Sequence, residues 1–100
     1  MAKPITKQQV QEMQSGKVKM IDIRSKEEYE KLHIPEAINI PAEDLSKELA
    51  AFEEEDIVVC VCTYGKERGQ QAAELLTNAG CKNAFYLEGG TMGWNDQKNF

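Results

Sequence analysis

Short apolar runs recur along the chain and are separated by amphipathic segments. The runs are rich in β-branched and aromatic residues, as buried strands are, and they cover residues 18–23, 37–40, 57–61 and 84–87. Residues 42–52 carry apolar side chains at helical spacing, with Leu45, Leu49 and Phe52 on one face. Residues 70–79 have helical composition and end before Gly80, a residue type that often follows a helix. The pattern predicts strands that alternate with helices.

Two further helices are marked by capping boxes at their starts. Thr6 is followed by Gln9, and Ser25 is followed by Glu28, so that each pair can satisfy two backbone N–H groups of a first helical turn. The first of these helices is expected to end at Gly16.

The alternation of strands and helices predicts a single α/β domain over residues 1–100. Its central sheet is expected to be mainly parallel and flanked by helices on both faces, with a short last helix around Trp94. Right-handed crossovers place the carboxyl ends of such strands on one rim of the sheet. We therefore expect the loops that follow Asp22 and Cys62 to lie on the same rim.

The loop from Cys62 to Arg68, Cys-Thr-Tyr-Gly-Lys-Glu-Arg, has the features of a reactive site. It joins a predicted strand to a predicted helix, where backbone N–H groups and the helix dipole favour an anion. Lys66 and Arg68 are near Cys62 in sequence, so we expect the thiolate form of Cys62 to be favoured. Five residues between Cys62 and Arg68 let the chain curl around a small anion. The loop predicts a thiolate nucleophile that faces an anionic substrate.

The other two cysteines are interpreted as structural. A cysteine in an apolar strand is usually a small buried hydrophobe, which fits Cys60, on the same side of its strand as Cys62. Cys81 follows Gly80 in a turn. Cys62 differs because it precedes a polar loop at the carboxyl end of a strand, where open α/β sheets bind ligands.

Composition limits the classes of partner. One hundred residues with 41% hydrophobic content suffice for one core, and the net charge of −5 argues against nucleic acid. The sequence contains no run of about 18 apolar residues, so no membrane span is predicted. The first residues lack the apolar segment of a signal peptide. Three cysteines without zinc-like spacing predict no metal and no cofactor, and they favour free thiols in a reducing, cytoplasmic compartment.

Four segments, in this order, resemble the rhodanese-like sulfurtransferase family. They are Ile21-Asp22-Ile23-Arg24-Ser25 with Glu28-Tyr29, then residues 33–41 (His-Ile-Pro-Glu-Ala-Ile-Asn-Ile-Pro), then the loop of residues 62–68, and finally Leu87-Glu88-Gly89-Gly90 followed by Gly93-Trp94. Each motif alone is weak, but the four together span about Met20 to Trp94 at spacings similar to those of the family.

The resemblance implies that Cys62 is catalytic and carries sulfur as a persulfide. Sulfane sulfur would come from thiosulfate or a persulfide, both small anionic donors, and pass to a thiol or cyanide-like acceptor, with a sulfur-relay protein as a further partner. The substrate-binding residues implied are those of the loop, namely Thr63, Tyr64, Gly65, Lys66, Glu67, Arg68 and Gly69. Their backbone amides can stabilise the thiolate and the persulfide anion.

Two departures from the family pattern matter: the first is expected to affect a turn more than the chemistry, and the second keeps an alternative open. Glu36 replaces a common Gly, and the loop has seven residues where the usual sulfurtransferase loop has six. The longer loop is typical of dual-specificity phosphatases and some arsenate reductases of the same superfamily. Val61, however, stands where those phosphatases carry His. Sulfur transfer is therefore the favoured hypothesis, with Glu67 expected to bulge outward as the extra residue.

A non-catalytic interaction module is the third hypothesis, since rhodanese-like domains often serve as docking units. The intact Cys62 argues against it. Asp22 and Arg24 are expected to form a structural ion pair or to cap a strand end, with contact to the site as the alternative. His33 is expected to be a hydrogen-bonded packing residue rather than a base.

Overall fold

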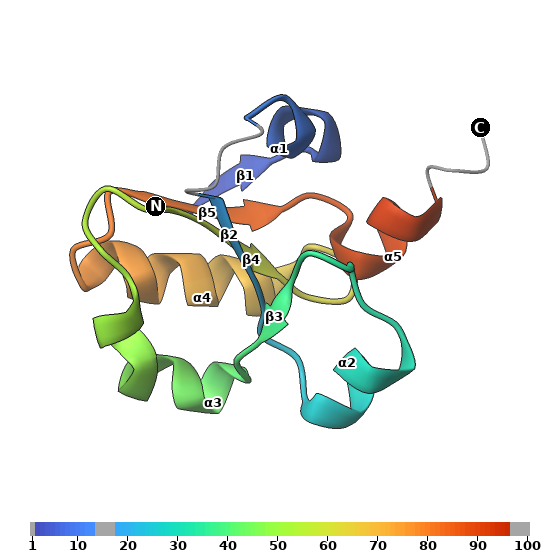
Figure 1. Ribbon diagram of the computed structural model, residues 1–100, viewed down its shortest axis with the longest axis horizontal. Coiled ribbons are helices and arrows are strands. Elements are labelled where there is room, and N and C mark those ends of the chain that lie inside the picture. The colour runs from blue at the N-terminus through green and yellow to red at the C-terminus, as the bar shows by residue number, and fades with distance from the viewer. Residues whose placement is uncertain (1, 14–17, 97–100) are drawn as a thin grey trace.

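The structure is a computed structural model that describes residues 2–13 and 18–96. Within this part, five strands form one sheet in the order β1-β5-β4-β2-β3, and every neighbouring pair is parallel (Figure 1). The strands are β1 (Lys3–Ile5), β2 (Val18–Asp22), β3 (Ile38–Asn39), β4 (Ile57–Val61) and β5 (Asn83–Leu87). The predicted α/β class with a parallel sheet is confirmed.

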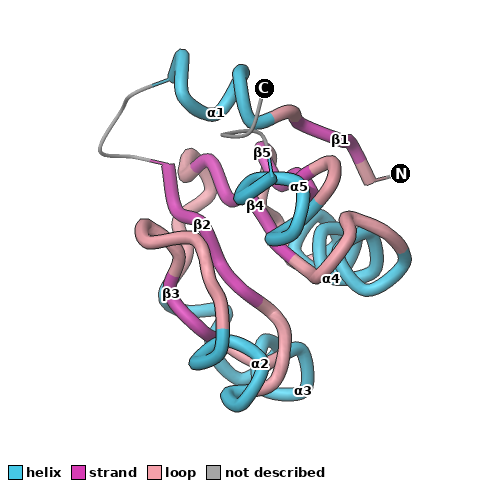
Figure 2. The backbone as a smooth tube through the Cα atoms, turned by 90° about the vertical axis from the view of Figure 1, so that its right-hand side faces the viewer, coloured by secondary structure: helices cyan, strands magenta, loops and turns pink. Residues whose placement is uncertain are grey.

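Helices lie on both faces of this sheet. They are α1 (Lys7–Met13), α2 (Lys26–Lys31), α3 (Ala42–Leu45), the 3₁₀ helix η1 (Ser46–Ala51), α4 (Glu67–Asn78) and α5 (Gly90–Asp96). Figure 1 shows α3 and α4 on one side of the sheet and α1 on the other, and Figure 2 gives the view turned by 90°. None of the helices in the described part is long and apolar enough to cross a membrane.

Strand β4 is the centre of two hydrophobic clusters. Val58 and Cys60, together with Cys62 just after the strand, belong to the cluster that includes apolar residues of α3 and α4. Val59 and Val61 belong to the opposite cluster, which includes apolar residues of β1, α1 and β5. This two-residue alternation places Cys60 and Cys62 on the same side, as predicted. Burial on both faces explains why the β4 sequence is continuously apolar.

Both capping boxes form. The Thr6 backbone N–H donates to Oε1 of Gln9 at 2.9 Å, and the Gln9 N–H donates to Oγ1 of Thr6 at 3.1 Å. Ser25 and Glu28 make the same reciprocal pair at the start of α2. Gly16, the predicted end of the first helix, lies outside the described residues.

Gly80 ends α4 as the sequence predicted. Its φ of +109° is in the region that favours glycine. The Gly80 N–H donates to the Thr77 carbonyl at 3.1 Å, and the Cys81 N–H donates to the Leu76 carbonyl at 3.0 Å. These two bonds form a Schellman motif, which satisfies carbonyls that the helix end leaves free.

Besides shifts of one residue at strand ends, one missed strand and two helices differ from the sequence prediction. Strand β1 was missed because it is a three-residue edge strand containing Pro4, which an edge position tolerates, and its pairing with β5 is long-range. The single helix expected over residues 42–52 is divided into α3 and η1, with non-helical dihedrals at Glu48. Helix α4 begins at Glu67 instead of Gln70, so Arg68 and Gly69 are helical.

Candidate active site

The loop after β4 is held in place by the start of α5. The Thr91 N–H donates to the Cys62 carbonyl at 2.9 Å, and the Met92 N–H donates to the Thr63 carbonyl at 3.0 Å. Two carbonyls of the loop thus face backbone donors of the last helix, which ties the position of Cys62 to the segment that follows β5.

This close approach depends on two glycines. A Cβ on Gly65, whose φ is +73°, would lie 2.4 Å from the Leu87 carbonyl oxygen. A Cβ on Gly90, whose φ is +59°, would lie 2.3 Å from the Cys62 carbonyl oxygen. No side chain fits at either position, so Gly65 of the loop and Gly90 at the start of α5 serve the same backbone contact.

Cys62 lies at the base of a pocket of about 430 Å³. Its side chain is buried among core residues, and only 3% of the residue is exposed. The Sγ atom is 3.9 Å from the Lys66 carbonyl oxygen, to which a protonated thiol can donate. A Cβ on Gly69 would lie 3.3 Å from Sγ, so Gly69 leaves the space that the sulfur occupies.

The pocket collects most of the residues that the sequence implied. Besides Cys62, its lining consists of Glu28, Thr63, Tyr64, Lys66, Glu67 and Arg68. Gly65 and Gly69 are not among the lining residues and act by leaving room for the backbone and for Sγ. Tyr64 is 61% exposed, the most exposed large hydrophobic residue of the described part, and it borders the pocket.

Arg68 is paired with Glu28, a residue that the sequence analysis noted as a helix cap and as part of a family-like segment but not as part of the site. The guanidinium nitrogens Nη1 and Nη2 lie 3.4 and 3.5 Å from the two carboxylate oxygens of Glu28. Nη2 also donates to Oγ1 of Thr63 at 3.1 Å. The sequence did predict that the loops after β2 and β4 share one rim of the sheet. The spacing of the motifs, however, does not indicate that Glu28 contacts Arg68.

The extra residue of the loop does not form a bulge. Glu67 is exposed, as expected, but it is the first residue of α4 and lines the pocket. An acidic residue in the first helical turn interacts favourably with the helix dipole, which accounts for its place there. The prediction of an outward bulge is therefore wrong.

Asp22 and Arg24 form the structural ion pair that the sequence predicted. Asp22 is completely buried, and its carboxylate accepts bonds from Nε and Nη2 of Arg24 at 3.0 and 2.9 Å. Arg24 also donates to the Leu32 carbonyl, and Asn39 donates to the carbonyls of Asp22 and Arg24. The pair joins the end of β2 to β3 and to the end of α2.

His33 is a packing residue, as expected. Its ring stacks on Tyr29 with centroids 3.9 Å apart, and Nδ1 lies 2.7 Å from the Tyr29 carbonyl oxygen. The Tyr29 hydroxyl in turn donates to the Ala37 carbonyl at 2.6 Å. His33 is absent from the lining of the Cys62 pocket.

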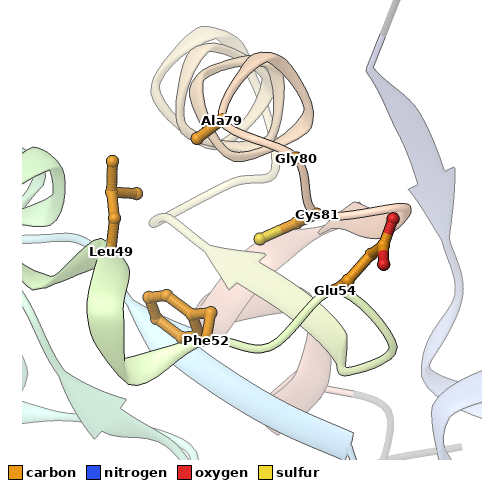
Figure 3. Close-up of a pocket in the computed structure, with 6 residues that line it drawn as sticks. All are labelled: Leu49, Phe52, Glu54, Ala79, Gly80 and Cys81. Carbon is orange, nitrogen blue, oxygen red and sulfur yellow. The ribbon is translucent and has the colours of Figure 1, made fainter.

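The other two thiols are held in their protonated form. Burial, with smaller contributions from Cys81 and Cys62, raises the pKa of Cys60 to about 12. Cys81 points into a separate pocket of about 270 Å³ between η1 and the end of α4 (Figure 3). Burial and then the negative charge of Asp56 raise the pKa of Cys81. Within the described residues, no group of three or more side chains is placed to hold a metal.

Known proteins resemble this chain in sequence and in fold. The model of the rhodanese-like domain matches residues 6–97. The chain belongs to the rhodanese-like domain family. It is 32% identical over 99 residues to the human thiosulfate:glutathione sulfurtransferase, with 85% of each chain covered. The structure of the human single-domain sulfurtransferase TSTD1 superposes with a TM-score of 0.85 at 30% identity and covers 97% of this chain and 98% of that one.

A second relative is longer than this chain. The putative sulfur carrier protein YrkF of Bacillus subtilis is 32% identical over 75 residues, which are 75% of this chain but only 40% of that protein. The names of these relatives support a rhodanese-type sulfurtransferase at the level of the family.

Proposed function

We propose that this protein is a sulfurtransferase that carries sulfane sulfur as a persulfide on Cys62. The observation that carries the proposal is the position of the Cys62 side chain. It lies at the carboxyl end of β4, before the N-terminus of α4, and at the base of an open pocket. A nucleophile at this point has a helix N-terminus beside it and borders the pocket through which a substrate can reach it.

The chemistry has two balanced steps. The Cys62 thiolate attacks the sulfane sulfur of thiosulfate, the S–S bond of the donor breaks, and its electron pair leaves with sulfite. An acceptor thiolate then attacks the outer sulfur of the Cys62 persulfide, and Cys62 leaves as a thiolate. In the first step, free backbone amides of the loop and of the start of α4 can stabilise the anionic sulfur, and Lys66 and Arg68, which line the pocket, are the cations available to the donor's oxygens.

A second hypothesis is phosphatase or arsenate reductase chemistry, which the seven-residue loop favours. The residue before the loop opposes it, because Val61 stands where those phosphatases carry His. The pocket also has no excess of positive charge for a phosphate dianion, since Lys66 and Arg68 are balanced by Glu28 and Glu67. Sulfur transfer is therefore the function that the site supports better.

The acceptor and compartment follow as parts of the same proposal. The three cysteines are free thiols, which supports a reducing compartment such as the cytoplasm. A relative named as a sulfur carrier supports a thiol of a relay protein as one acceptor.

Turnover with variants tests the proposal. The wild-type protein should transfer sulfur from thiosulfate or a persulfide to a thiol acceptor, and Cys62→Ser should lose this activity completely. Cys81→Ser is the matched control, because Cys81 also borders a pocket but lies between η1 and the end of α4, and it should keep the wild-type rate. Hydrolysis of an aryl phosphate that requires Cys62, without sulfur transfer, would replace this function with the phosphatase hypothesis.

A further inference from the structure

The ion pair between Glu28 and Arg68 lies within the lining of the Cys62 pocket. The two residues are forty positions apart in sequence, on α2 and α4, and both border the same space of about 430 Å³. The pair is partly exposed, with half of the Arg68 side chain and 42% of the Glu28 side chain accessible to solvent. A ligand that enters the pocket therefore meets the pair directly.

Glu28 is fixed in this position by its own helix. The Ser25 backbone N–H donates to Oε1 of Glu28 at 3.1 Å, and the Ser25 hydroxyl lies 3.2 Å from the same oxygen. The bond from the Ser25 backbone N–H is the main cause that lowers the pKa of Glu28, and Arg68 lowers it further. The carboxylate is thus charged at neutral pH and is held at the edge of the pocket.

The charges of the pocket cancel. Its charged lining residues are two acids, Glu28 and Glu67, and two bases, Lys66 and Arg68. Arg68, the base that could hold an oxyanion in forked geometry, already faces the carboxylate of Glu28 at 3.4 and 3.5 Å. A dianion has to separate this pair or approach a carboxylate, and both are unfavourable.

The size and the mouth of the pocket suit an organic donor. A volume of about 430 Å³ lies within the range of about 300–1,000 Å³ typical of sites for small organic molecules. The exposed ring of Tyr64 offers a face for the carbon atoms of a donor, which an inorganic anion does not possess.

We propose that Glu28 is a specificity-determining residue. Its ion pair with Arg68 keeps that guanidinium from binding the thiosulfate dianion, and it thereby favours small organic persulfides as donors of sulfur to Cys62. The inference rests on the proposed function. In the favoured step, the Cys62 thiolate attacks the outer sulfur of R–S–SH, the donor S–S bond breaks, and its electron pair leaves on R–S⁻. The proton of the outer sulfur passes through water to R–S⁻, which gives R–SH and the Cys62 persulfide anion.

The test is Glu28→Gln, because glutamine retains the capping box while it removes the charge. The matched control is Glu27→Gln, an exposed acid in the same helical turn that does not line the pocket. Cys62 loading is measured by quenched-flow intact mass, with thiosulfate and with freshly prepared cysteine persulfide as donors. Removing a carboxylate that faces a dianion should raise the thiosulfate rate constant about five- to tenfold.

The rate constant for cysteine persulfide should change by less than about twofold in Glu28→Gln, since its reacting end carries less charge. Glu27→Gln should match the wild-type protein with both donors. An unchanged ratio of the two rate constants in Glu28→Gln, or equal acceleration of both, would overturn the inference and leave the proposed function in place.

The wild-type protein supplies a second test that needs no variant. It should load faster from cysteine persulfide than from thiosulfate, and the reverse order would also overturn the inference. Absence of loading from either donor would overturn the proposed function itself, and this inference with it.

Discussion

Gly69→Ala tests how closely the packing behind Cys62 defines its reactivity. Gly69 is buried in the first turns of α4, and a Cβ there would lie 3.3 Å from Sγ of Cys62 and 3.4 Å from Cβ of Tyr86. The same Cβ would lie 3.6 Å from the Cys60 carbonyl oxygen. Because backbone and strand atoms surround it, the new methyl group must displace Sγ by a few tenths of an ångström.

The expected effects on stability and activity differ in size. Alanine in a helix interior is favoured over glycine by about 1 kcal/mol. Crowding in a well-packed core costs about 1–3 kcal/mol. The net change in the free energy of unfolding should therefore be small, a loss of at most about 2 kcal/mol. The loading rate of Cys62 should fall about tenfold, since a shift of about 1 Å at a reacting group can cost about a hundredfold.

The assay combines urea unfolding with the rate of Cys62 persulfide formation. Gly93→Ala is the matched control, since its Cβ would meet only the Glu88 carbonyl oxygen at 3.9 Å, an ordinary contact. The control should load at the wild-type rate. Wild-type loading by a folded Gly69→Ala protein would refute the claim that the Cys62 sulfur has no free space on this side.

Three further predictions follow from buried or charged groups. Asp22→Asn leaves Arg24 without its buried charged partner, so the free energy of unfolding in urea should fall by about 3–5 kcal/mol. A fall of less than about 1 kcal/mol would contradict the structural role of the pair. Arg68→Ala should weaken thiosulfate use about 10- to 100-fold, while the melting temperature changes little because its ion pair is half exposed; a large drop in melting temperature with unchanged kinetics would make Arg68 structural. Cys60 has a pKa raised from 9.0 to about 12 in the folded state, so the unfolded chain loses this proton first and stability should fall as pH rises from 9 toward 12. In Cys60→Ala that part of the alkaline decline should disappear, and identical pH profiles of unfolding for both proteins would disprove the assignment.

The elements that sequence patterns predicted are those whose own residues carry the signal. Strand β4 is apolar throughout because both of its faces are buried, so its position in the sheet is written in its composition. The capping boxes at Thr6 and Ser25 involve residues only three positions apart, and the end of α4 at Gly80 is a local hydrogen-bond motif. In the capping boxes and at Gly80 the signal and the structure involve the same few residues.

What the sequence missed depends on contacts between distant segments. Strand β1 exists because β5 pairs with it, and its three residues carry little signal of their own. The start of α4 lacks a side-chain cap, since Lys66 makes no capping hydrogen bond, so the helix could not be placed at Glu67 from the sequence.

At the candidate site, the sequence pointed to Cys62 and its loop but not to the contact between Glu28 and Arg68. The carboxylate of Glu28 was recognised for its capping box with Ser25, which is local. Its second contact, with Arg68, depends on how α2 and α4 are arranged at the rim of the sheet. Spacing between motifs carries no information on that arrangement.

The most direct test of the account is the mass of the protein after brief exposure to cysteine persulfide or thiosulfate. We expect a gain of one sulfur atom, located on Cys62 by peptide mapping, and its loss when a thiol acceptor is added. Cys62→Ser should gain none, since Cys60 and Cys81 both have raised pKa values. Sulfur found on Cys60 or Cys81 instead, or an unchanged mass with both donors, would contradict the assignment of Cys62 as the sulfur carrier.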